Sequence, residues 1–178
     1  MPRKEAYRKS SASKRRELLV ELNNVLKNIQ EARYVVQTRR KYLAELEQRA
    51  VGREYAEALR SLEGELDSLD MALEKLALRM ETIIAIREVV VDVSEAAKAI
   101  GVAKAVVGRI LSKYNATDIS GPLQQISDSL NRAWAVLERL GEESGTRVSS
   151  SVSDEEVNRI LREAEEEAKR RRPLSQPV

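Results

Sequence analysis

The chain has 178 residues, a formal net charge of only +2, and neither Cys nor His. Disulfide frameworks, thiolate or imidazole catalysis and the usual Cys/His zinc sites are therefore excluded, and we expect neither enzymatic activity nor a cofactor. With 34% charged and 3% aromatic residues, the composition is typical of extended helices rather than of a deep globular core. No apolar run approaches the ~18 residues of a transmembrane helix and no signal peptide is visible, so a soluble, cytoplasmic protein is expected.

Residues 1–12 are basic, polar and Ser-rich, which predicts a flexible arm. Ser13 is a plausible cap for a first helix that extends to about Ala50. Apolar residues recur along this helix in alternating steps of four and three, the spacing that drives left-handed helix pairing. Interrupted only by Arg39, the stripe comprises Leu18, Leu22, Val25, Ile29, Ala32, Val36, Leu43, Leu46 and Ala50.

Gly52 supplies a turn, and a second helix begins near Arg53. Its stripe has the same rhythm, so the two helices are predicted to form an antiparallel hairpin. The stripe comprises Tyr55, Leu59, Leu62, Leu66, Leu69, Leu73, Leu76, Met80 and Ile83. Residues 1–41 carry a net charge of +8 and residues 42–81 a net charge of −5. The two arms can therefore attract each other within one molecule or between neighbours.

The second helix meets no Pro before Pro122 and is predicted to run on past the end of the first. This overhang is broadly apolar and lacks a partner within the hairpin, so it is the predicted polymer contact. The contact residues are Ile83, Ile84, Ile86, Val89, Val90, Val93 and Ile100. Gly101 and Gly108 further along indicate either close packing against a neighbouring helix or a hinge in the long arm.

A third helix is predicted from Ser120 to Gly141, with Pro122 in its first turn and Trp134 as a packing anchor. Residues 13–141 then form the helical core and residues 142–152 a linker. A capping box at Ser153 opens a short amphipathic helix that ends near Arg171, so that residues 153–178 comprise this helix and a Pro-punctuated tail. The fold class is all-α: a long antiparallel helical hairpin with an over-long second arm, a short third helical element and a detached C-terminal amphipathic helix.

This order of elements resembles the ESCRT-III family, and within it the archaeal CdvB-type cell-division proteins. One stretch that carries the resemblance is RMETIIAIREVVVDVSEAAKAIG, from Arg79 to Gly101. The other is SDEEVNRILREAEEEAKRR, from Ser153 to Arg171, which is similar to the C-terminal helix of the family. Residues 13–141 cover the core region of the family.

The resemblance implies a protein that forms homopolymers, with or without paralogues, on the inner face of the membrane and constricts it during cell division. It also implies remodelling by a AAA ATPase whose MIT domain binds C-terminal motifs. Carried over by position, a helical motif falls on Ile160, Leu161 and Ala164. A Pro-rich motif falls on Pro173, Leu174 and Pro177.

Basic residues of the arm and first helix are the predicted anionic-membrane contacts, each contributing about 1 kcal/mol when well placed. They are Arg3, Lys4, Arg8, Lys9, Lys14, Arg15, Arg16, Lys27, Arg33, Arg39, Arg40 and Lys41. The arm has no bulky apolar wedge, so adsorption rather than deep insertion is expected. The alternative interpretation of such a run of charges is a solvated tail.

The apolar overhang can be buried in two ways. The helix around Trp134 can fold back over it in a closed monomer, or a neighbouring hairpin can replace that helix in a head-to-tail filament. Two other functional classes remain open at this point. One is a soluble coiled-coil adaptor or scaffold, and the other is a nucleic-acid-binding coiled coil, which the lack of aromatics among the basic residues disfavours. No nucleic-acid partner is therefore expected.

Overall fold

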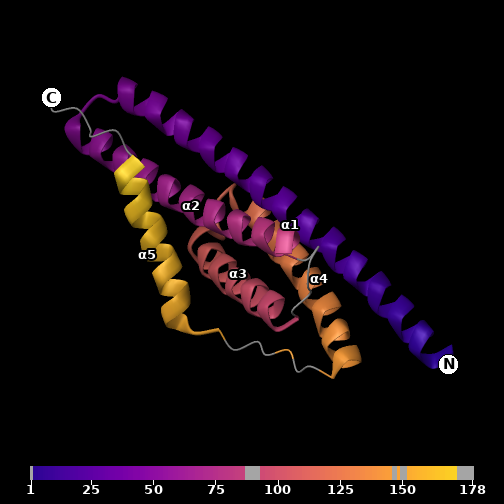
Figure 1. Cartoon of the computed structure of the whole chain (residues 1–178). Coiled ribbons are helices and arrows are strands. Elements are labelled where there is room, and N and C mark those ends of the chain that lie inside the picture. Colours follow the sequence, from indigo (N-terminus) through magenta and orange to yellow (C-terminus); the bar gives the residue numbers. More distant parts are fainter. Residues whose placement is uncertain (1, 87–92, 146–147, 149–151, 172–178) are drawn as a thin grey trace.

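The computed structural model describes residues 2–86, 93–145, 148 and 152–171, with side chains from residue 12 onward except that of Ser144. These residues form five α-helices and no strand, so the all-α prediction is confirmed for the described chain (Figure 1). The helices are α1 (Pro2–Arg49), α2 (Arg53–Ile86), α3 (Val93–Tyr114), α4 (Ser120–Ser144) and α5 (Asp154–Arg171).

The predicted hairpin is formed by α1 and α2, which pack along each other over most of their shared length. Gly52 lies between them with φ +109°, a conformation that residues with a side chain rarely adopt. The six apolar stripe residues from Leu18 to Val36 are almost completely buried. The opposite charges of the two arms meet within the molecule, as Arg33 Nε lies 2.9 Å from Asp70 and Arg40 Nε lies 2.9 Å from Asp67.

Helix α1 begins at Pro2 rather than at Ser13, so the segment predicted to be a flexible arm is helical. The physical reason is that extending an existing helix needs no new nucleus, and the Arg, Lys, Glu and Ala residues of this segment are good helix formers. Figure 1 shows the N-terminal end of α1 projecting past the end of α4.

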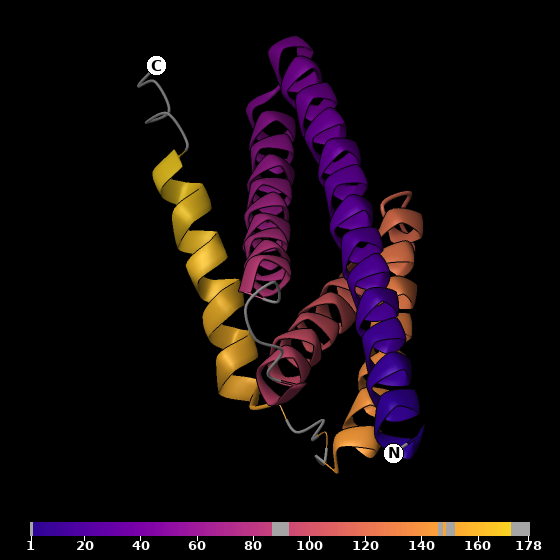
Figure 2. The same cartoon turned by 45° about the vertical axis from the view of Figure 1, so that its right-hand side comes forward.

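The second arm is not one long helix. Helix α2 ends at Ile86, and after residues 87–92 helix α3 turns back and packs on α4 instead of extending α2 (Figures 1 and 2). The predicted extended overhang is therefore corrected to a closed arrangement. The reason is the apolar content of α3 itself, because Ile100, Val106 and Val107 are fully buried. An extended arm would leave this surface in water at a cost of about 25 cal/mol per Å².

Helix α4 packs against both α1 and α3. Along α1 it follows an antiparallel register in which Arg139 pairs with Glu17 at 3.1 Å and Arg132 pairs with Glu21 at 3.2 Å. The helix continues past the predicted end at Gly141 to Ser144, because Gly145 provides the left-handed C-cap with φ +71°. The segment after α4 also packs on the core through Val148 and Val152, so residues 142–152 are only in part a linker.

The C-terminal helix α5 is docked rather than detached, which corrects the prediction. It packs on α2 and, less extensively, on α3. Val157, Ile160, Ala164 and Ala168 are buried along one face. The N-cap half of the predicted capping box is present, since the Glu156 backbone N–H donates to Ser153 Oγ at 3.2 Å. A short helix with so thin an apolar face is marginal alone, and tertiary packing stabilises it.

Two glycines of α3 have different surroundings. A Cβ at Gly101 would lie 3.1 Å from Val152 Cγ2 and 3.8 Å from Trp134 Cζ3, so Gly101 serves close packing, and Trp134 is the packing anchor that the sequence predicted. A Cβ at Gly108 would meet nothing within 4 Å. Helix α3 runs unbroken through both positions. A hinge at Gly101 or Gly108 therefore stays a prediction.

Gly108→Ala is expected to stabilise the protein by up to about 1 kcal/mol, because Ala replaces Gly inside a helix at an open position. Gly101→Ala is the matched control, in which the new methyl group would lie 3.1 Å from Val152 Cγ2, so a smaller gain is expected. Urea unfolding followed by circular dichroism measures both free energies. A Gly108→Ala variant no more stable than Gly101→Ala would contradict this assignment.

Candidate functional site

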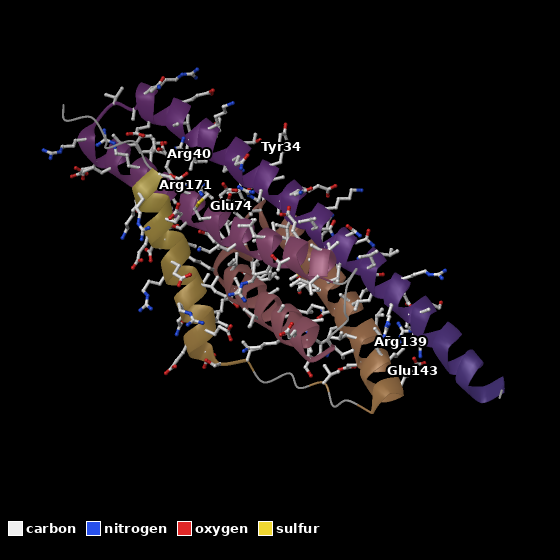
Figure 3. The ribbon with its side chains drawn as sticks, in the orientation of Figure 1. Tyr34, Arg40, Glu74, Arg139, Glu143 and Arg171 are labelled. Carbon is white, nitrogen blue, oxygen red and sulfur yellow. The ribbon has the colours of Figure 1, made fainter. Side chains whose placement is uncertain are left out.

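Part of the basic charge of α1 is used inside the molecule. Lys14 pairs with Glu143 and Arg39 with Asp118, both at the α4 side, whereas Arg33 and Arg40 bind carboxylates of α2. Figure 3 shows Arg40 directed into the space between α1 and α2. The hydrogen bond to Asp70 raises the pKa of Arg33 against the opposing effect of burial. These four predicted membrane contacts hold helices together in the closed structure.

A second set of cations lies on the opposite side of α1. Lys27, Tyr34 and Lys41 are spaced seven residues apart, and Arg16 and Val20 continue the same side toward the N-terminus. All five side chains are exposed, and Tyr34, at 71% exposure, points away from the other helices (Figure 3). We call Arg16, Val20, Lys27, Tyr34 and Lys41 the outer face of α1. It combines positive charge with amphipathic and apolar side chains.

The remaining predicted membrane contacts either lie on another side of α1 or belong to its first turns, where only the backbone is described. Arg15 is exposed but lies about 100° around the helix from Arg16. Arg3, Lys4, Arg8 and Lys9 belong to the first turns of α1, where the backbone is described and the side chains are not. Val20 and Tyr34 were not predicted as site residues. Their signal in the sequence was that both fall outside the buried stripe, in step with Lys27 and Lys41.

The predicted polymer contact is only partly accessible. Ile83, Ile84 and Val93 are half-buried against the core, Ile86 is exposed, and Ile100 is fully buried in the core. Val89 and Val90 lie outside the described residues. The described members of this set therefore do not form one continuous exposed surface, because Ile100 is buried in the core while Ile86 is exposed.

The predicted ATPase-binding helix faces inward. Ile160 and Ala164 are buried and Leu161 is half-buried. At the rim of this contact, Arg171 Nη1 lies 3.1 Å from Glu74, and Figure 3 shows the two side chains approaching each other. Pro173, Leu174 and Pro177 lie outside the described residues. A partner that binds Ile160, Leu161 and Ala164 must compete with α2 and α3.

A groove of about 460 Å³ lies where α2, α3 and α5 meet. Its lining includes Ser61, Gly64 and Glu65 of α2, Tyr114 of α3, and Lys169 of α5. Burial raises the pKa of Tyr114 to about 12, and the negative charge of Glu65 adds to this effect. The phenol therefore stays neutral well above physiological pH.

Titration of Tyr114 gives a testable stability effect. Below pH 10 the phenol is neutral in both states, whereas between pH 10 and 12 it ionises first in the unfolded chain. The free energy of unfolding is therefore expected to fall as pH rises through this window. Tyr114→Phe should reduce that fall. Urea unfolding on both sides of pH 10 tests this, and identical pH profiles for the two proteins would show that Tyr114 does not contribute.

No helix in the described chain is long and apolar enough to cross a bilayer. Nor do the described residues contain a group of three or more acidic side chains arranged to hold a metal ion. Comparisons with protein-family models, curated proteins and solved structures find no match to this chain.

Proposed function

We propose that this chain is a peripheral membrane protein of ESCRT-III type that adsorbs to anionic membrane through the outer face of α1 and then polymerises. One observation carries the proposal. Arg33 and Arg40 of α1 pair with carboxylates of α2, and Lys14 pairs with Glu143 of α4. By contrast, Arg16, Lys27 and Lys41 are exposed on the opposite side of α1, beside Tyr34. Three aligned cations and an amphipathic aromatic ring suit the surface of an anionic leaflet.

The outer face supports adsorption rather than insertion. Val20 and Tyr34 are the large apolar or aromatic side chains among its five members, so little apolar area enters the acyl region. Binding should depend mainly on charge and weaken with salt. The proposed location is the inner face of the cell membrane at an archaeal division site, where the polymer would constrict the membrane.

Polymerisation is proposed to require opening of the closed structure. Ile100 is buried and Ile83 is half-buried, so α3 must leave α4 before the predicted polymer contact becomes continuous. Gly101 and Gly108 are the proposed hinge. Release of α5 by a AAA ATPase with an MIT domain is the corresponding proposal for disassembly. Copolymers with paralogues belong to the same proposal.

The test is to pellet the purified protein with anionic and with neutral vesicles at low and high salt, and to image the pellet by electron microscopy. We expect binding to anionic vesicles only, loss of binding at high salt, and filaments or tubes on the membrane. A parallel assay with double-stranded DNA addresses the nucleic-acid alternative. Binding to DNA without binding to anionic vesicles would overturn the proposal. No binding to either would favour the soluble scaffold.

A further inference from the structure

The tip of the hairpin, residues 41–62, is built from the ends of α1 and α2, and Ser61 at its base lines the groove shared with α3 and α5. Asp118, two residues before α4 begins, pairs with Arg39, so α4 runs back from this level toward the N-terminus of α1. Helix α3 ends at Tyr114, beside Glu65 of α2. Figure 2 shows the tip extending past the ends of α3, α4 and α5. We refer to residues 41–62 as the tip.

The apolar stripe of α2 continues into the tip, but one of its heptad positions is exposed there. Tyr55, Leu62, Leu69 and Leu76 occupy the same heptad position of α2, one every seven residues. Leu76 is 0% and Leu69 4% exposed in the body of the molecule, whereas Leu62 is 47% and Tyr55 56% exposed on the tip. This heptad position is thus buried in the body, where α3 and α5 pack on α2, and exposed on the tip.

Helix α1 shows the same change. Val36 is fully buried, but Leu43 and Ala50, one and two heptads further on, are only half-buried. At the apex Val51 is 96% exposed. Tyr42 is also half-exposed. On the tip, both helices therefore have partly or largely exposed residues at heptad positions. Two further helices would bury these residues.

We propose that two copies of this chain associate tip to tip, so that the two tips form an antiparallel four-helix bundle about a two-fold axis. In the body, α4 packs on α1 and α5 packs on α2, so two further helices cover the hairpin there. At the tip, a second hairpin supplies two helices with the same heptad pattern. An isologous contact of this kind closes at two copies, so it is separate from a head-to-tail filament contact.

The charges of the tip favour a second copy as the occupant. Residues 41–62 contain four basic and four acidic residues, so two tips meet without net repulsion. Lys41 lies at the base of the tip and Glu54 near its apex. An antiparallel overlap of about ten residues, or roughly 15 Å, places Lys41 of one copy beside Glu54 of the other. It also carries the apex to the level of Tyr114, where α3 ends.

The experiment uses Leu62→Glu with Leu78→Glu as a matched control. Leu78 is 56% exposed on α2, similar to Leu62, but lies outside the tip. Sedimentation equilibrium without lipid should show the wild-type mass doubling from 20.1 kDa as concentration rises. Leu62→Glu should remain monomeric, and Leu78→Glu should behave like the wild type. A wild-type protein that stays monomeric, or two variants that behave alike, would overturn the proposal.

A crosslink provides a second test that does not depend on a destabilising change. The chain has no Cys, and Ala58 is exposed midway along the α2 half of the tip, near the proposed two-fold axis. Ala58→Cys should form a disulfide-linked dimer on mild oxidation, whereas Leu78→Cys should not. Equal crosslinking of both variants would contradict the tip contact. Vesicle binding is measured separately, so failure here leaves the membrane proposal intact.

Discussion

Replacing Arg16, Lys27 and Lys41 together with Ala is expected to weaken binding to anionic vesicles roughly a hundredfold. Each cation near an anionic leaflet contributes about 1 kcal/mol, and about 1.4 kcal/mol corresponds to a factor of ten in affinity. The fold should not change, because all three side chains are exposed on the side of α1 opposite its buried stripe. Vesicle cosedimentation at low salt measures the affinity, and circular dichroism measures the helix content.

A matched variant replaces Lys98, Arg159 and Arg162 with Ala. These three cations are also exposed, but they belong to α3 and α5. The net charge changes by the same amount, so any general electrostatic attraction falls equally. We expect this variant to retain vesicle binding. Equal losses in the two variants would show that total charge, rather than the outer face of α1, determines membrane binding.

Ile160→Asp is expected to release α5 while leaving the bundle of α1 to α4 folded. Ile160 is 2% exposed, so the variant loses a buried apolar side chain and places a carboxylate in an apolar contact. Among the described elements α5 packs only on α2 and α3, so the damage is confined to one appended helix. Once released, a helix of 18 residues with so thin an apolar face is only marginally stable in water.

Hydrogen exchange measured by mass spectrometry should show at least a tenfold loss of protection in α5 and unchanged protection in α1 and α2. Release also opens the groove, so the pKa of Tyr114 should move from about 12 back toward its ordinary value of 10. Arg159→Asp is the control, because it introduces the same carboxylate at an adjacent exposed position. If α1 and α2 lose protection as well, α5 is an integral part of the bundle rather than an appended helix.

Periodicity alone was sufficient for the hairpin. The two heptad stripes and the single Gly52 turn fix which faces of α1 and α2 meet, because side-chain direction along a helix follows from spacing. The cap at Ser153 and the Pro in the first turn of α4 were equally local signals, and both lie where they were predicted. Such features depend on residues within one or two turns of each other.

The candidate site was only half predictable. Counting basic residues could not separate Arg33, which binds Asp70, from Lys27, which is exposed. Both are cations of the same helix, and their difference arises from which side α2 and α4 cover. The opposing carboxylates are 37 residues away for Asp70 and 129 residues away for Glu143, which pairs with Lys14.

The sequence by itself determined an all-helical chain, the hairpin, the N-cap at Ser153 and the number of basic residues on α1. Only the tertiary structure decided that the second arm folds back as α3, that α5 docks on α2, and that four cations of α1 are engaged internally. The physical reason is that local signals specify how a helix forms and which face is apolar. They do not specify which other helix will cover that apolar face. The hydrophobic effect is non-directional, and its strength depends roughly on the area removed from water.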